Sequence, residues 1–147
     1  MDARRDAPVF AEGEIQIRAD VQVVWDLMAR IDDWPRWNPD IKSARLEGPL
    51  AEGSRFTWRS GPGTITSTLR SVRSRQEIGW SGRSLGITAL HVWRLDSTPG
   101  GTVVRTEESW EGLPARLLRG WSHRTVKSAI DSGLRHLKGA AEAPTGS

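Results

Sequence analysis

The chain has 147 residues, which suits one domain of ordinary size and is too short for two. It has no cysteine, so disulfides, thiolate catalysis and cysteine-ligated metals are excluded, and its net charge of +3 is too small to require a polyanionic partner. It also lacks an apolar run long enough to cross a bilayer and an apolar secretory signal, so we expect a cytoplasmic location.

The two ends of the chain show no periodicity and mix charged residues with Ala and Pro. We therefore expect a flexible arm at 1–12 and a flexible tail at 142–147, on either side of a single domain at 13–141. No repeat or Pro/Ser-rich linker divides the interior.

The first ordered segment is a strand at 14–19, where isoleucines alternate with polar residues. Asp20 can then cap a helix over 21–31, because its carboxylate can accept the free amide protons of the first turn. Apolar residues recur at intervals of three and four along that helix, so one stripe of it is expected to be buried. Two prolines limit 32–40 to one short turn of helix.

The central part of the chain has the period of an antiparallel meander, with Gly- and Pro-containing turns between short alternating runs. Strands are predicted near 41–47, 54–60, 64–73, 76–82, 86–96 and 102–112. One set of alternating positions is aromatic and apolar and the other is polar, so one face of the sheet should be buried and the other solvated. The inward set consists of Phe56, Trp58, Ile65, Ser67, Leu69, Ile78, Trp80, Ala89, His91, Trp93, Leu95, Val104, Thr106, Glu108 and Trp110.

The last segment predicts a long helix from about 114 to 138. Its expected buried stripe consists of Leu118, Trp121, Thr125, Ala129, Gly133 and Leu137, flanked by Val126, Ile130 and Leu134. A helix about 10 Å across cannot fill the concave side of a strongly twisted sheet of this size, so a ligand-sized cavity is expected. The predicted fold is α+β, with a curved seven-strand antiparallel sheet around the long C-terminal helix and two short helices after the first strand.

Six segments in chain order carry a resemblance to a known family. They are DVQVVWDLMARIDDWPRWNPDI (20–41), GSRFTW (53–58), IGWSGRS (78–84), ALHVWRL (89–95), GGTVVRTEESWEG (100–112) and GLRHLKGAAE (133–142). Together they resemble the START/SRPBCC superfamily, and within it the polyketide cyclase/dehydrase and lipid-transport-like branch, over residues 12–142. The resemblance implies a helix-grip fold with a deep cavity for a hydrophobic small molecule. It does not imply one reaction, because members include carriers, receptors, aromatases and cyclases.

His91 and Glu108 are the ionisable residues of the inward set. Two interpretations of them stay open. Burial can perturb such groups so that they act as acid and base on a substrate, or the two can form a buried hydrogen-bonded pair of purely structural origin. A β-bulge in the last strand would turn Glu107 inward in place of Glu108.

The tryptophans of the inward set offer flat surfaces on which a planar or polycyclic ligand can stack, although some of them must pack in the core. Trp37, in the proline-stiffened segment, is a candidate lid contact. The predicted ligand-binding residues are Trp37, Phe56, Trp58, Ile65, Ser67, Leu69, Trp80, Ala89, Trp93, Thr106, Trp110, Trp121, Thr125 and Ala129. Arg59 and Arg83 could meet an anionic group of the ligand or could simply be solvated.

No metal and no cofactor are expected, because the three histidines are not spaced as HExxH and no carboxylate cluster accompanies them. The expected partner is a hydrophobic small molecule, with no nucleic acid and no insertion into a membrane. We expect a monomer or a homodimer, with the outward-facing Leu90 and Val92 as candidate dimer contacts.

The sequence leaves three functional hypotheses open. The favoured one is binding of a hydrophobic, aromatic or polycyclic small molecule in the cavity. The second is an enzyme that cyclises or dehydrates a polyketide-like substrate, with His91 and Glu108 moving protons. The third is a non-enzymatic carrier or interaction domain, which predicts an open groove with an exposed apolar rim.

Overall fold

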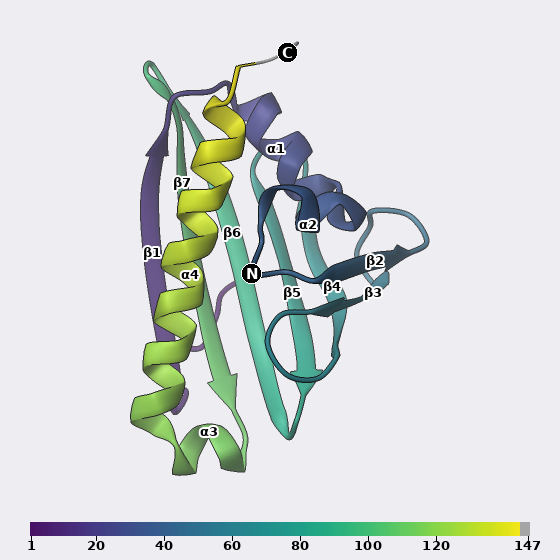
Figure 1. Ribbon diagram of the computed structural model, residues 1–147, viewed down its shortest axis with the longest axis vertical. Coiled ribbons are helices and arrows are strands. Elements are labelled where there is room, and N and C mark those ends of the chain that lie inside the picture. Colours follow the sequence, from purple (N-terminus) through teal and green to yellow (C-terminus); the bar gives the residue numbers. More distant parts are fainter. Residues whose placement is uncertain (145–147) are drawn as a thin grey trace.

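Seven antiparallel strands form one curved sheet in the order β1-β7-β6-β5-β4-β3-β2 (Figure 1). The computed structural model describes residues 1–144, and residues 145–147 of the expected tail lie outside the described residues. The strands are β1 (Val9–Ile17), β2 (Ser43–Glu47), β3 (Arg55–Arg59), β4 (Ile65–Arg73), β5 (Glu77–Ser84), β6 (Ile87–Thr98) and β7 (Gly101–Glu111). The predicted seven-strand antiparallel sheet is therefore confirmed: β2 to β7 form the six-strand meander, and β1 pairs with β7 at one edge.

Three short helical elements follow β1. They are α1 (Val21–Ala29), the 3-10 helix η1 (Ile31–Asp33) and α2 (Trp34–Trp37). The cap is as predicted, because Asp20 Oδ1 accepts from the Gln22 amide at 2.8 Å. The Trp34 indole N–H donates to the Met28 carbonyl at 3.0 Å, and Trp34 is only 3% exposed, so α2 is fixed onto α1.

The C-terminal segment forms two helices, where the sequence predicted one. They are α3 (Leu113–Leu117) and α4 (Arg119–Glu142). Between them Leu118 has backbone angles of φ −111° and ψ 42°, which are not helical, and its amide donates to the Pro114 carbonyl at 3.0 Å. The bend lets α3 contact β6 and β7 at one end of the sheet before α4 runs along the concave face (Figure 1). None of the described helices is long and apolar enough to span a membrane.

The buried face of α4 is rotated from the expected stripe. Its buried residues are Ser122, Val126, Ile130, Gly133, Leu134, Leu137 and Ala141. Leu118 and Trp121, which the sequence placed in the stripe, are both 55% exposed. The reason is the bend at Leu118 together with the cavity, since Trp121, Thr125 and Ala129 lie on the flank of α4 that borders it.

The register of the sheet puts the predicted inward set on the concave face. β6 pairs with β7 so that Ala89 lies opposite Trp110 and His91 lies opposite Glu108. Because this pairing runs along both strands without a shift, Glu108 faces inward and Glu107 faces outward. The alternation in the sequence correctly predicted that Glu108, and not Glu107, faces inward.

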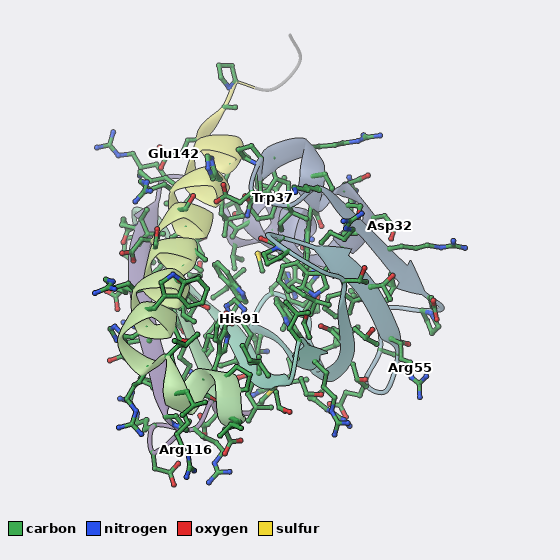
Figure 2. All side chains as sticks on the ribbon, turned by 60° about the horizontal axis from the view of Figure 1, so that its bottom comes forward. Asp32, Trp37, Arg55, His91, Arg116 and Glu142 are labelled. Atoms are coloured by element: carbon green, nitrogen blue, oxygen red, sulfur yellow. The ribbon has the colours of Figure 1, made fainter. Side chains whose placement is uncertain are left out.

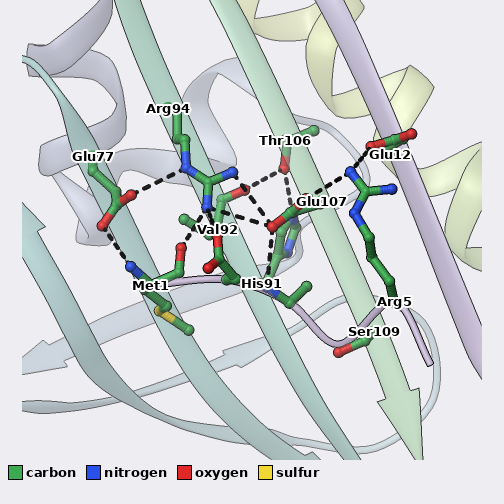
Figure 3. Close-up of polar contacts among 12 residues, drawn as sticks. Met1, Arg5, Glu12, Glu77, His91, Val92, Arg94, Thr106, Glu107 and Ser109 are labelled. Carbon is green, nitrogen blue, oxygen red and sulfur yellow. Dashed lines mark hydrogen bonds and ion pairs between the residues drawn. The ribbon is translucent and has the colours of Figure 1, made fainter. Parts of the chain in front are cut away.

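The chain's own N-terminal segment, which the sequence predicted as a flexible arm at 1–12, covers the part of the convex face around Val92 and Glu107. Elsewhere this face is solvated as predicted, since outward residues such as Arg55, Arg83 and Arg105 are exposed. The last four residues of that expected arm belong to β1. The residues before them cross the sheet, with the Ala3 amide donating to Glu107 Oε1 at 3.1 Å and the Arg4 amide donating to Ser109 Oγ at 3.0 Å (Figure 3). Side chains two residues apart on one strand present acceptors to an extended backbone, which explains this docking.

An ion-pair network lies beneath this segment (Figure 3). Arg94 Nε donates to Glu77 Oε1 at 3.2 Å, and Arg94 Nη1 lies 3.4 Å from Glu107 Oε1. The Met1 ammonium lies 3.4 Å from Glu77 Oε2. Val92, a candidate dimer contact, is completely buried on this face, so it cannot contact a second copy of the chain.

Candidate functional site

A cavity of about 460 Å³ lies between α4 and the concave face of the sheet. A row of small residues forms part of its wall, since Ser67 pairs with Gly82 and Gly82 pairs with Ala89 on adjacent strands. A Cβ at Gly82 would lie only 2.9 Å from Ser67 Oγ, so even an alanine would crowd this row. These small side chains leave the space next to them empty, because one helix does not reach far enough to fill it.

Most of the predicted ligand-binding residues line this cavity. They are Trp37, Trp58, Ile65, Ser67, Trp80, Ala89, Trp93, Trp110, Trp121, Thr125 and Ala129, together with His91 and Glu108. Phe56, Leu69 and Thr106 face inward as predicted but are at most 2% exposed in the packed core and do not line the cavity. Arg59 and Arg83 are exposed and lie outside the lining.

Part of the lining was not predicted from the sequence. The loop at 60–62 contributes to it, as do Leu85 and Ile87 beside the β5–β6 turn and Pro114 at the start of α3. A Cβ at Gly86 would lie 3.4 Å from Pro114 Cγ, which shows that this turn and α3 are in contact. The turns are visible in the sequence, but their meeting with α3 depends on the unpredicted bend.

Trp34 is part of the aromatic wall of the cavity and packs against Trp58 and Trp80. Its ring centroid lies 5.7 Å from that of Trp58 and 5.3 Å from that of Trp80. The Trp58 indole N–H also donates to Ser67 Oγ at 3.0 Å, which fixes the orientation of that ring. Packed aromatic clusters of this kind give a wall of defined shape.

Trp37 and Trp93 contribute carbon surface to the cavity. Both residues line it, but each indole nitrogen is buried among protein atoms and has no hydrogen-bond partner within the described part of the chain. Since neither N–H is accessible, a ligand in this conformation would contact the ring carbons. Gly133 of α4 makes room for Trp93, because a Cβ there would lie 3.5 Å from Trp93 Cη2.

His91 of β6, which is labelled in Figure 2, and Glu108 of β7 form a hydrogen-bonded pair on the concave face of the sheet. His91 Nδ1 lies 2.9 Å from Glu108 Oε1, and His91 Nε2 lies 3.0 Å from Thr106 Oγ1. The Thr106 hydroxyl donates to the Val92 carbonyl at 2.9 Å, so it must accept from His91 and Nε2 must carry a proton. The pair therefore holds one further proton between Nδ1 and Oε1, either as imidazolium and carboxylate or as two neutral groups.

The carboxylate form of Glu108 is favoured by its surroundings. Burial by itself would raise the pKa of Glu108, but the charge of His91 and hydrogen bonds from His91 and Trp110 outweigh it and hold that pKa below its usual value. Trp110 Nε1 donates to Oε2 at 2.5 Å. Each carboxylate oxygen can accept more than one hydrogen bond, and Glu108 lines the cavity, so it can also accept from a ligand.

His91 orients this carboxylate and has no free nitrogen for a ligand. Nε2 is engaged by Thr106 and Nδ1 by Glu108. The sequence predicted the pair correctly but could not divide the roles between its members. In this geometry Glu108 is the member of the pair that keeps hydrogen-bonding capacity toward the cavity, and His91 is the member that orients it.

The cavity continues into a polar hollow along α4. The two share the residues Asp40, Ser60, Gly61, Trp121, Thr125 and Ala129. Beyond them the hollow is lined by Arg124, Ser128, Ser132 and Arg135. A ligand with an apolar body and a polar end could therefore leave that end at the surface of α4.

Residues 9–142 match the family described as polyketide cyclase / dehydrase and lipid transport. The chain belongs to this family. The match covers nearly the whole fold and confirms the resemblance that six short segments carried in the sequence. A search of curated proteins found no match.

Several solved structures resemble the chain in fold. The hypothetical protein jhp0584 from Helicobacter pylori has a TM-score of 0.84 at 14% identity, with 94% of this chain and 90% of that chain covered. The di-domain ARO/CYC StfQ from the steffimycin biosynthetic pathway has a TM-score of 0.78 at 16% identity, with 91% of this chain and 50% of that chain covered. The di-domain ARO/CYC BexL from the BE-7585A biosynthetic pathway has a TM-score of 0.73 at 17% identity, with 95% and 52% covered.

At these identities the likenesses show the fold alone, and the chain spans about half the length of each di-domain protein. The predicted helix-grip fold, a curved antiparallel sheet around a long C-terminal helix, is confirmed.

Proposed function

We propose that the chain binds a hydrophobic, planar aromatic small molecule in the cavity between α4 and the sheet. The observation that carries this proposal is a cavity of about 460 Å³ that is walled by indoles and lined by the buried carboxylate of Glu108, with Asp40 at its border with the polar hollow. Volumes of 300 to 1,000 Å³ are typical of pockets for drug-sized ligands. Aromatic walls bind flat apolar molecules by stacking and by removing apolar surface from water.

The position of Glu108 selects among such molecules. An ionised carboxylate that already accepts from His91 and Trp110 can add a hydrogen bond from a phenolic or enolic hydroxyl. A ligand without a donor would leave a charged group desolvated beside it, at a cost in affinity. The favoured ligand is therefore an aromatic or polycyclic molecule with at least one hydroxyl group.

Isothermal titration calorimetry with 2-naphthol and with larger hydroxylated polycycles tests this proposal. Ala89→Leu extends a side chain into the cavity and is expected to lower the affinity by about tenfold or more. Thr88→Leu is the matched control, because Thr88 is the exposed neighbour on the same strand and faces away from the cavity. Absence of binding to any such compound, or equal affinities of the two variants, would contradict the proposal.

A second candidate is a cyclase or dehydratase acting on a polyketide-like substrate, and the His91–Glu108 pair favours it. Glu108 could accept a proton from a folded substrate while His91 keeps the carboxylate oriented, and the walls would hold reacting atoms in register. The two ARO/CYC structures from biosynthetic pathways support testing it. Turnover lost in His91→Ala and Glu108→Gln to a far greater extent than binding would establish catalysis, and unchanged turnover in both would remove these roles.

A further inference from the structure

Exposed apolar side chains gather at one end of the molecule. Five large hydrophobic residues there are more than half exposed, and they come from the β5–β6 turn, from α3 and from the start of α4. They are Leu85 (66%), Leu113 (65%), Leu117 (71%), Leu118 (55%) and Trp121 (55%). Figure 1 shows α3 and the β5–β6 turn at the same end of the sheet. Contiguous apolar exposure of this kind is uncommon on proteins that work in water alone and marks an interaction surface.

This apolar end adjoins the cavity. Leu85 and Trp121 belong both to the exposed set and to the lining of the cavity, and Pro114 lines it from the first turn of α3. The contact between Gly86 and Pro114 joins the β5–β6 turn to α3 along the same border. A surface that docks here would therefore lie next to the cavity, at residues that are exposed and also line it.

The charges of α3 and of the first part of α4 have one sign, and the neighbouring Glu111 at the end of β7 is paired with Arg4. From Gly112 to Ile130 the chain has four Lys and Arg residues and no Asp or Glu. Arg116, Arg119 and Arg124 are exposed and form no ion pair within the described part of the chain. Arg116 lies at the end of the molecule that α3 occupies (Figure 2). Basic residues beside exposed Leu and Trp are the composition of a segment that lies in the interface of an anionic bilayer.

We propose that this end, formed by the β5–β6 turn, α3 and the first turn of α4, docks on the surface of an anionic lipid bilayer. Leucine and tryptophan side chains would enter the interfacial layer, and the arginines would contact lipid phosphates. A second copy of the chain fits less well, because a symmetric contact would bring two sets of unpaired arginines together. An acidic protein fits the charges, but it does not account for leucines that are more than half exposed on α3 and on the segments beside it.

The docking gives the cavity a direct exchange route with the bilayer. A hydrophobic ligand could pass between the lipid and the cavity without crossing water, as a carrier requires. This exchange rests on the proposed ligand binding, whereas docking on the bilayer does not depend on it. The proposal also revises the expectation of no membrane insertion, because it places a few side chains in the interface without any spanning segment.

Co-sedimentation of the full chain with vesicles tests the docking. We expect binding to vesicles of phosphatidylcholine with phosphatidylglycerol, weaker binding in high salt, and much weaker binding to phosphatidylcholine alone. Leu113→Ser/Leu117→Ser should lower the vesicle affinity by about tenfold or more, and Val23→Ser is its control, since Val23 is an exposed hydrophobic residue on α1. Arg116→Gln/Arg119→Gln should lower it by about thirtyfold, and the control Lys42→Gln/Arg45→Gln removes the same charge elsewhere.

These variants change exposed side chains outside the cavity lining, so binding of 2-naphthol in vesicle-free solution should be the same in all of them. Loss of vesicle binding with intact ligand binding supports the docking surface. Equal vesicle binding by the patch variants and their controls, or no binding to anionic vesicles, overturns it. Sedimentation equilibrium tests the alternative of a second copy. If the unchanged protein is a dimer and Leu113→Ser/Leu117→Ser is a monomer, the proposed membrane docking is overturned in favour of dimerisation, whatever the outcome of the ligand titration.

Discussion

The two faces of the sheet bury carboxylates in different ways. On the convex face the chain itself supplies the partners of Glu77 and Glu107, through Arg94, Ser71 and the N-terminal segment. On the concave face Glu108 is held by His91 and Trp110 but lines a cavity. Groups of the first kind stabilise the fold, whereas a group of the second kind retains hydrogen-bonding capacity that a ligand can use.

The largest effect should follow from breaking the convex network. Arg94→Ala leaves Glu77 and Glu107 without their shared cation and should lower the free energy of unfolding by about 3 kcal/mol in urea denaturation at pH 7. Arg105→Ala, on the neighbouring strand, removes solvent-exposed pairs to Glu14 and Asp96 and should lower the free energy of unfolding far less, because water screens those pairs. Equal losses of unfolding free energy in the two variants would show that the buried network on the convex face stabilises the protein no more than an exposed ion pair does.

The concave carboxylate should instead determine affinity. Glu108→Gln is expected to weaken binding of 2-naphthol by about tenfold, because a hydrogen bond to a charged acceptor becomes one to a neutral acceptor. The affinity for the methyl ether of 2-naphthol, which has no donor, should not fall. Glu107→Gln, on the convex side of the same strand, is the control and should leave both affinities unchanged.

The two faces should both contribute to acid sensitivity. On the convex face, burial by itself would raise the pKa of Glu77. Hydrogen bonds from Ser71 and from the Met1 ammonium, together with the charge of Arg94, outweigh burial and lower that pKa. On the concave face the pKa of Glu108 is also lowered, by His91 and Trp110. The unfolded chain therefore binds protons more readily at both positions. The stabilisation is complete above the usual carboxyl pKa of about 4.3 and is lost as the pH falls through the lowered values.

Unfolding measured from pH 7 to pH 3 should show a smaller loss of stability in Glu77→Gln and in Glu108→Gln than in the unchanged protein. The double variant should show the smallest loss, because the two sites share no partner. A loss of the same size in all four proteins would show that other carboxylates control acid unfolding.

The smallest effect concerns the helix side of the cavity. Gly133→Ala places a methyl group 3.5 Å from Trp93 Cη2, an ordinary contact, and should stabilise α4 by up to about 1 kcal/mol. Gly139→Ala, whose Cβ would meet nothing within 4 Å, should give a similar gain. A clear loss of stability in Gly133→Ala alone would show that the wall around Trp93 has less room than the structure indicates.

Local sequence pattern was sufficient for the sheet and for the concave side of the site. Strict alternation along β6 and β7 identified His91 and Glu108 as neighbours facing inward, since a strand has only two faces. The length and spacing of the last helix also indicated that a cavity would remain. These features depend on periodicity, which a single sequence displays directly.

Features that depend on contacts between distant segments were not predictable in this way. The N-terminal residues have no pattern of their own, and their order comes from acceptors such as Glu107 on β7. The bend at Leu118 interrupts a run that keeps helical spacing, so the exposure of Leu118 and Trp121 was missed. Phe56 and Leu69 were assigned to the correct face but not to the correct depth, which only the packed aromatic cluster determines.

A crystal structure of the protein with 2-naphthol bound is the most direct test of the central claim that the indole-walled cavity is a ligand site. The account predicts the rings of the ligand between α4 and the wall formed by Trp58 and Trp80, with the hydroxyl about 2.6 to 2.8 Å from a Glu108 carboxylate oxygen. A cavity filled by the protein's own side chains, or a ligand bound only outside it, would contradict the account.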